Sequence, residues 1–281
     1  MKNAIKNIQI FALGTTFVKQ KGGTSISSRR LIYIRDLLYE LVVGDVKIRY
    51  KSSLLGIGWS LLNPLMQLLV YQFVFGLILQ NQISNYATFL FSGLLVWSWF
   101  QASLLSATTA IVDNRDLIKR PGFPMATLPV VSVTTELIHF VLALPILFIV
   151  IILEGGQVTG TILALPLVVV VQFTLTLSVA YLTAAIHVTF RDIKYLLGIV
   201  LRLFFFLTPI FYTLDHIPER YHFFFRLNPM LHLIEAYRAI LMQGELPEWP
   251  PLLALGLLAG VILRLGYSAF LRASYHFVEE L

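Results

Sequence analysis

An uncharged run, residues 52–112, constrains the fold more than any other feature, because it contains no Asp, Glu, Lys or Arg. It follows a basic segment that ends with Lys47, Arg49 and Lys51, and the next charged residue is Asp113. Lys and Arg keep their charged groups at lipid phosphates while apolar residues enter the hydrocarbon. The stretch 47–67 therefore predicts the point at which the chain passes from water into a membrane.

Composition supports a bilayer as the solvent of this chain. Of the 281 residues, 57% are hydrophobic and 13% are charged, and the mean hydropathy is +0.79. A soluble domain has about 25% charged residues, and a water-soluble core of this size cannot bury so much apolar surface. We predict an all-α membrane protein. Cysteine is absent, which excludes disulfides and thiolate metal sites.

The basic charge is concentrated at the start of the chain. Residues 1–56 hold ten Lys or Arg and three acids, out of a net charge of +6 for the whole sequence. A basic block before a spanning helix is typical of a cytoplasmic membrane surface, so we predict no nucleic-acid partner. The first apolar run, Ile8 to Leu13, is too short for a cleavable signal peptide. Residues 1–30 form an N-terminal extension without an assigned role.

Helical spacing begins after this extension. Leu31, Ile34, Leu38 and Leu41 fall on one face, with charged residues toward another. Residues 31–52 are therefore predicted to form an amphipathic helix in the membrane interface. The alternative is a soluble helix packed on a partner.

Six spanning helices follow in the predicted transmembrane domain, 53–281, near residues 57–79, 86–112, 128–153, 160–186, 195–214 and 251–271. Asn63-Pro64 predicts a kink in the first. The segments assigned to the inside carry most of the basic residues, and the first two outer turns carry none. The positive-inside rule then places both termini in the cytoplasm.

Two connections are unusual. In residues 113–124, Asp113 or Asn114 is predicted to cap a helix of about two turns that Pro121 ends. This loop is either a solvated connector or a docking knob for a cytosolic partner. Residues 215–250 are too long for a turn and too apolar for a solvated loop. Their two apolar pieces, 221–227 and 230–242, are too short to cross and predict re-entrant or interfacial helices.

Motifs for catalysis are missing. The sequence has no G-x-x-x-x-G-K-[ST], G-x-S-x-G or H-E-x-x-H pattern, so the chain is not predicted to be an enzyme on its own. Glu136 and His139 form one E-x-x-H within a span. A metal half-site would need a second such motif, so an internal hydrogen-bonded pair is favoured and no metal is predicted. Arg202 and Arg264 either snorkel to the inner surface or face a polar pathway.

Aromatic residues are abundant at 13%. Most Phe side chains in a span face lipid. However, rings also pack on sugars while making few strong hydrogen bonds, and a tunnel lined by them would pass a glycan without holding it. The candidate channel aromatics are Trp97, Trp99, Phe100, Phe204, Phe205, Phe206 and Tyr212.

Four motifs in order resemble a known family. They are RDLLYELVVGDVKIRYKSSLLGIGWSLLNPL, DNRDLIKRPGFP, FRDIKYLLGIVLRLFFFLTPIFY and FRLNPMLHLIEAYRAILMQG. Together they resemble the permeases of ATP-binding-cassette transporters that export polysaccharides such as O-antigen, capsule or teichoic acid. The resemblance runs from about Leu31 to Arg272. It implies a multi-pass protein of the bacterial cytoplasmic membrane that works as a homodimer with two copies of a separate ATPase.

The resemblance also implies roles for particular residues. The ATPase would bind ATP and Mg, so this chain would need no cofactor, and its substrate would be a lipid-linked polysaccharide. Coupling to the ATPase would fall to Asn114, Arg115, Asp116, Leu117, Ile118, Lys119 and Arg120. A lipid pyrophosphate headgroup would enter near Arg35, Lys47, Arg49 and Lys51. The exit would be narrowed by Tyr221, Phe223, Phe224, Phe225, Asn228 and Pro229.

Other functions remain open at this point. A related exporter of a drug or small lipid is disfavoured by the basic entrance and the aromatic density. A membrane enzyme acting on polyprenyl substrates would need paired carboxylates or a metal cluster at one depth, and a purely structural subunit is the simplest alternative.

Overall fold

The structure, a computed structural model, describes residues 28–51, 53, 56, 58–78 and 83–280. This part of the chain is helical and contains no strand. Two compact units divide the chain at residue 36, and residues 37–281 form the larger one. The predicted extension 1–30 lies almost wholly outside the described residues.

The main helices are α2 (Ser28–Tyr50), α3 (Gly58–Tyr71), α4 (Tyr86–Asp113), α5 (Arg115–Ile118), α6 (Thr127–Leu153), α7 (Leu165–Thr189), α8 (Ile193–Leu207), α9 (His222–Arg226), α10 (Pro229–Arg238), α11 (Trp249–Ser274) and α12 (Phe277–Glu280). Short π- or 3₁₀-helical turns cover Gln72–Ile78 (η1), Gly160–Ala164 (η2), Leu214–His216 (η3), Glu219–Tyr221 (η4) and Ala239–Gln243 (η5).

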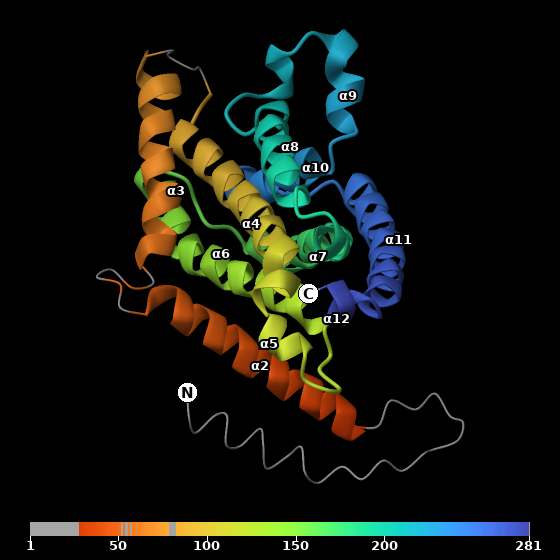
Figure 1. The fold of residues 1–281 in the computed structure, drawn as a ribbon. Helices are drawn as coiled ribbons and strands as arrows, with labels where there is room; N and C mark the ends of the chain where they lie inside the picture. The colour runs from red at the N-terminus through yellow and green to blue at the C-terminus, as the bar shows by residue number, and fades with distance from the viewer. Residues whose placement is uncertain (1–27, 52, 54–55, 57, 79–82, 281) are drawn as a thin grey trace. The chain divides into compact units, whose positions relative to one another are not determined.

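The larger unit is built around α4. This helix packs against α6 and α7 and also contacts α3, α8 and α10, as Figure 1 shows. Most of its side chains are buried, whereas few of those in Gly58–Ile78 are. α11 packs along α7, on the side of the bundle opposite α3 (Figure 1). The exposed residues of α3 and α8 are mostly apolar, as expected for helices that meet lipid or another subunit, although Lys194 and Arg202 of α8 are exposed as well.

Five helical segments in the described part of the chain are long and apolar enough to span a membrane: Gly58–Ile78, Tyr86–Asp113, Thr127–Leu153, Gly160–Thr189 and Trp249–Ser274. They correspond to the predicted first, second, third, fourth and sixth spans. A hydrocarbon core requires about 20 helical residues, and each of these segments has at least 21. The protein is therefore an all-helical, multi-pass membrane protein.

The predicted fifth span is different. Its helix, α8, covers Ile193–Leu207 and has 15 residues, so the prediction of a helix to residue 214 is wrong at its C-terminal end. Thr208 is extended, with φ −102° and ψ 131°, because the following Pro209 disfavours the helical region for the residue before it. The Thr208 hydroxyl then donates to the Phe204 carbonyl at 2.7 Å. A crossing through α8 remains a prediction.

The predicted interfacial helix has the expected extent but a different surface. α2 begins at Ser28 and ends at Tyr50. Tyr39 and Ile48 are exposed, at 68% and 72%, and their separation puts them on opposite faces of a helix. The apolar residues of α2 are thus not confined to one face, and its position in a membrane interface remains a prediction.

Candidate functional site

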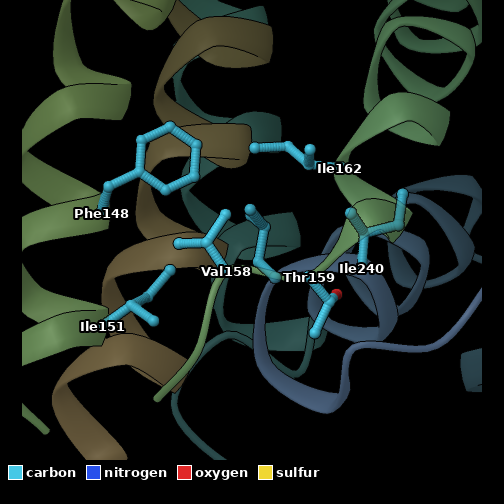
Figure 2. Close-up of a pocket in the computed structure, with 7 residues that line it drawn as sticks. Phe148, Ile151, Val158, Thr159, Ile162 and Ile240 are labelled. Atoms are coloured by element: carbon cyan, nitrogen blue, oxygen red, sulfur yellow. The ribbon is translucent and has the colours of Figure 1, made fainter. Parts of the chain in front are cut away.

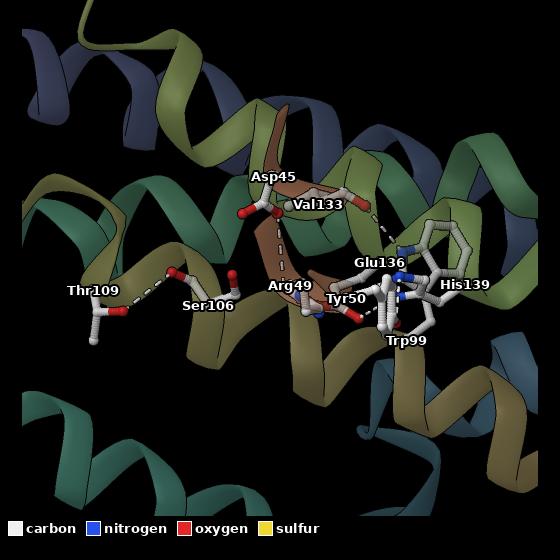
Figure 3. Close-up of polar contacts among 9 residues, drawn as sticks. All are labelled: Asp45, Arg49, Tyr50, Trp99, Ser106, Thr109, Val133, Glu136 and His139. Carbon is white, nitrogen blue, oxygen red and sulfur yellow. Dashed lines mark hydrogen bonds and ion pairs between the residues drawn. The ribbon is translucent and has the colours of Figure 1, made fainter. Parts of the chain in front are cut away.

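An ion pair joins α2 to the middle of α6. Arg49 donates to Oε1 of Glu136 at 2.5 Å, and its second terminal nitrogen lies 3.7 Å from Asp45 (Figure 3). The Glu136 side chain is 8% exposed, whereas that of Arg49 is 34% exposed. Burial alone would lower the pKa of Arg49, but the Glu136 carboxylate outweighs it and raises the pKa above its ordinary value. The guanidinium therefore stays charged.

His139 and Tyr50 extend this network. His139 lies one turn from Glu136, with Nδ1 3.1 Å from Oε2, and its Nε2 is 3.0 Å from the Tyr50 hydroxyl (Figure 3). One neutral tautomer satisfies both contacts, because Nδ1–H donates to Glu136 and Nε2 accepts from Tyr50. The predicted internal Glu136–His139 pair is confirmed. Sequence spacing could not reveal that Arg49 and Tyr50, almost ninety positions earlier, complete it.

The other predicted entrance cations differ from Arg49. Lys47 and Lys51 are exposed, and neither forms an ion pair with another described residue. Arg35, within residues 1–36, is paired with the neighbouring Asp36 at 2.8 Å. Lys47 and Lys51 are thus the cations of this set whose charge is not already matched by a carboxylate.

The loop 113–124 contains one helical turn, α5, rather than the predicted two. Asn114 holds the N-cap position, but its side chain does not cap α5: Nδ2 donates to the Ala110 carbonyl at 2.8 Å and closes the end of α4 instead. Ile118 is 2% exposed and anchors the turn. Asp116, Lys119 and Arg120 remain exposed, so the loop presents charged side chains to the surface while the buried Ile118 holds α5 in place.

Several predicted channel aromatics form one connected cluster. Ring centroids lie 5.9 Å apart for Trp97–Phe205 and 6.0 Å for Phe205–Phe211, and Phe211 continues to Tyr212 at 5.0 Å. The full cluster is Tyr71, Phe75, Trp97, Phe100, Phe205, Phe206, Phe211, Tyr212 and Phe225. Sequence reasoning missed Tyr71, Phe75 and Phe211, which come from α3, η1 and the segment after α8.

The predicted set is not one surface, however. Trp99 stacks on Phe140 at 5.1 Å instead of joining the cluster. It also donates to the Val133 carbonyl at 3.4 Å, as Figure 3 shows. Trp97 and Trp99 are each 2% exposed, whereas Phe204 and Phe206 are 43% and 56% exposed. Exposure along α8 therefore marks the rings that are free to meet another molecule.

The predicted exit region divides into an exposed turn and a buried anchor. Tyr221, Phe223 and Phe224 are exposed. Asn228 accepts from the Met230 amide at 3.0 Å and caps α10, and its Nδ2 donates to the Thr208 hydroxyl at 2.8 Å. Pro229 occupies the first turn of α10, where a missing amide hydrogen is harmless.

A buried arginine fixes the break after α8. Arg238 of α10 is 7% exposed and donates to the carbonyls of Pro209 at 2.9 Å, Ile210 at 2.7 Å and Phe89 at 3.1 Å. Its guanidinium carbon also lies 3.4 Å from the centre of the Phe89 ring. These contacts hold α10, α4 and the residues after α8 together.

One small cavity lies between the ends of α6 and η5. It is lined by Phe148, Ile151, Val158, Thr159, Ile162, Ile240 and Leu241 (Figure 2) and holds about 10 Å³. This is about the volume of a single water molecule, and Thr159 supplies its one polar side chain. No substrate fits there.

Fold and site together define a multi-pass helical membrane protein with a charged junction between α2 and α6, a connected aromatic cluster and an exposed charged turn. Residues 36–242 match the model of the ABC-2 type transporter family, and the chain belongs to that family.

Three relatives illustrate the similarity. The chain is 38% identical to an O-antigen export system permease protein RfbA of Myxococcus xanthus over 90% of this chain and 98% of the relative. It is 33% identical to an RfbA of Klebsiella pneumoniae over 89% and 96%. A polysialic acid transport protein KpsM of Escherichia coli is 26% identical over 82% of this chain and 90% of its own length.

Proposed function

We propose that this protein is the permease subunit of an ATP-driven exporter that moves a lipid-linked polysaccharide across the bacterial cytoplasmic membrane. The observation that carries the proposal is the match to an O-antigen export permease along 98% of that relative's length. A separate ATPase supplies the energy, since this sequence has no phosphate-binding loop of the G-x-x-x-x-G-K-[ST] form.

The working unit in this proposal has two permeases and two ATPases, with both termini of each permease in the cytoplasm. The apolar, largely uncovered α3 and α8 support a contact with a second copy. In that arrangement α8 forms the fifth of six crossings, completed by residues 208–214, and the helices between residues 215 and 250 are re-entrant. Short helices at membrane depth are tolerated when they are covered by protein.

Substrate entrance is assigned to the α2–α6 junction. Lys47 and Lys51 are exposed cations that suit a pyrophosphate. Arg49 already binds Glu136, so it contributes as a shared cation: a phosphate that reaches Arg49 competes with a buried carboxylate. Arg35 is proposed as a further cation for the headgroup on the basis of the sequence motif alone.

The passage is assigned to the aromatic residues near α8. Phe204 and Phe206 are exposed and would meet the glycan, together with Tyr212. Trp97 and Phe100 would support that surface from behind, because their side chains are largely buried and Trp97 packs on Phe205, whereas Trp99, which packs on Phe140, would hold α4 against α6. Tyr221 and Phe223 to Phe225, on the far side of the buried Asn228-Pro229 anchor, would narrow the exit.

Coupling to the ATPase is assigned to Asn114 to Arg120. Leu117→Asp would place a charge beside the buried Ile118 and is expected to weaken ATPase association while the permease still folds. A matched control is Leu227→Asp, at a residue that is 66% exposed in the predicted exit region. Co-purification of the ATPase that is as strong with Leu117→Asp as with the control would contradict docking at this loop.

The central experiment uses proteoliposomes that contain the permease and its ATPase. A lipid-linked glycan is expected to stimulate ATP hydrolysis and to become accessible on the opposite side of the membrane. If hydrolysis instead responds to small lipids or drugs and never to the glycan, the alternative of a drug or small-lipid exporter holds.

A further inference from the structure

A groove lies between α7 and α11, and none of its lining residues belongs to the proposed entrance, the aromatic cluster or residues 114–120. Its volume is about 310 Å³, and its lining residues are Leu177, Tyr181, Gly260, Leu263, Arg264 and Tyr267. Most of the lining is apolar, and the groove is open to the surroundings of the bundle. One guanidinium, that of Arg264, is therefore part of a surface that otherwise suits a hydrocarbon chain.

Arg264 lies in the C-terminal half of a membrane-spanning helix, from which its long side chain can reach toward the level of the lipid phosphates. It is ten residues before the end of α11 at Ser274, which corresponds to about 15 Å along a helix. An arginine at such depth is costly unless it is paired. In the described part of the chain, no hydrogen bond or ion pair reaches its side chain.

A second polar group accompanies Arg264. Tyr267 follows it by three positions and so lies on the same face of α11. The ring of Tyr267 packs edge-on against Tyr181 at 5.4 Å, but its hydroxyl has no hydrogen-bond partner among the described residues. The Tyr181 hydroxyl, by contrast, donates to the Ala126 carbonyl at 2.8 Å. One guanidinium and one phenol hydroxyl thus remain available at the groove.

Glycine spacing along α11 explains the shape of the groove. At Gly266 a β-carbon would lie 2.9 Å from the Ser178 carbonyl oxygen, so α7 and α11 are in near-backbone contact there. At Gly260 nothing lies within 4 Å of the position of a β-carbon. The helices are closed at one end of the groove and leave an open slot at the other, where a chain can lie against the backbone of α11.

The membrane itself is the source of a counter-charge. Within the five candidate spans of the described chain, the carboxylates are Asp113, at the very end of α4, and Glu136, which Arg49 and His139 already bind. A second copy of the chain therefore has no unused mid-span carboxylate to offer Arg264. A lipid phosphate brings the required negative charge together with an acyl chain that fits an apolar slot.

We propose that the α7–α11 groove binds an anionic phospholipid, with the phosphate on Arg264 and the Tyr267 hydroxyl and an acyl chain along Gly260. The lipid neutralises the intramembrane arginine and fills the slot between the two helices. This site is separate from the proposed polysaccharide pathway.

The test measures lipid bound to the purified full-length protein. The protein is placed in nanodiscs or mild detergent with phosphatidylglycerol or phosphatidylcholine, and native mass spectrometry counts the retained lipids. The wild-type chain is expected to retain phosphatidylglycerol in preference to phosphatidylcholine. Arg264→Gln is expected to weaken phosphatidylglycerol binding by about tenfold, the loss typical of a hydrogen bond to a charged group.

Two further variants separate this site from general effects. Gly260→Leu keeps the charge and puts a side chain into the slot from a position whose β-carbon has open space around it, and leucine favours the helix over glycine, so the variant should fold and still lose the lipid. Arg202→Gln, in the exposed face of α8, removes an arginine outside the groove and should leave binding unchanged.

Several results would overturn the proposal. They are equal lipid retention by Arg264→Gln and Arg202→Gln, undiminished binding by Gly260→Leu, or equal retention of the neutral and anionic lipids. Retention of a polyprenyl pyrophosphate in place of phosphatidylglycerol, or a change in oligomeric state with Arg264→Gln, would assign the groove to the substrate or to a second copy instead.

Discussion

Replacing Arg238 tests how the outer part of the bundle is held together. Its guanidinium donates to three backbone carbonyls and covers the Phe89 ring, and among the described residues no carboxylate forms an ion pair with it. Desolvation by burial lowers the pKa of Arg238 to about 9, so it still carries its charge at neutral pH. The fold therefore depends on a buried cation whose direct partners are backbone carbonyls and an aromatic ring.

The expected effect follows from opposing contributions. Each hydrogen bond to a charged group stabilises by roughly 1.5–3 kcal/mol. The desolvation that lowers the pKa of Arg238 offsets about 5 kcal/mol of this gain, since one pKa unit corresponds to about 1.4 kcal/mol. Truncation also leaves a cavity against Phe89, which costs a further few kcal/mol. We expect Arg238→Ala to lower the free energy of unfolding by about 3 kcal/mol. Arg238→Met, which fills the space without a charge, should lower it by about 1 kcal/mol.

The assay is equilibrium unfolding in mixed detergent micelles with increasing sodium dodecyl sulfate, followed by circular dichroism and tryptophan fluorescence. Arg226→Ala, at an exposed arginine of α9, is the matched control and should change little. If Arg238→Ala unfolds at the same detergent fraction as this control, the contacts of Arg238 do not stabilise the fold. If Arg238→Met is less stable than Arg238→Ala, filling the space without a charge does not recover stability, and the reasoning above is refuted.

Three further predictions use the same assay. Glu154 accepts from the amides of Ala87 and Thr88 in the first turn of α4 at 3.1 and 2.8 Å, so Glu154→Gln should cost about 1 kcal/mol, and an unchanged midpoint would contradict its role as a cap. Gly266→Ala should cost about 1–3 kcal/mol by forcing α7 and α11 apart, whereas Gly260→Ala should not destabilise; equal behaviour of the two would refute the close contact. A double-mutant cycle of Arg49→Ala with Glu136→Gln should give a coupling energy of about 1–2 kcal/mol, and additive single effects would show that the pair is not formed.

Most of the helical segments were predictable because membrane crossing is a local property. A run of about 20 apolar residues must satisfy its own backbone in lipid, so the candidate spans from Gly58 to Ser274 agree with their predictions to within about three residues. The exception is α8, where proline chemistry at Thr208-Pro209 ends the helix earlier than hydropathy indicated.

The candidate site was predictable only in part. Charge and motif order pointed to Arg49, to residues 114–120 and to the aromatic residues of α8. The sequence did not reveal that Asn114 closes α4 instead of capping α5, or that Trp97 and Trp99 face different neighbours. Neighbouring positions on a helix point in different directions, and a central helix has protein on most of its sides.

The sequence by itself determined that this chain is a membrane protein and where most of its spanning segments lie. It also determined that the chain carries no nucleotide-binding loop of the G-x-x-x-x-G-K-[ST] form. The tertiary structure alone decided that Arg49 is bound by Glu136, that Arg238 holds the end of α8, and that Arg264 is without a protein partner among the described residues. Hydropathy acts residue by residue along the chain, but the partner of a buried charge depends on which distant helix packs beside it.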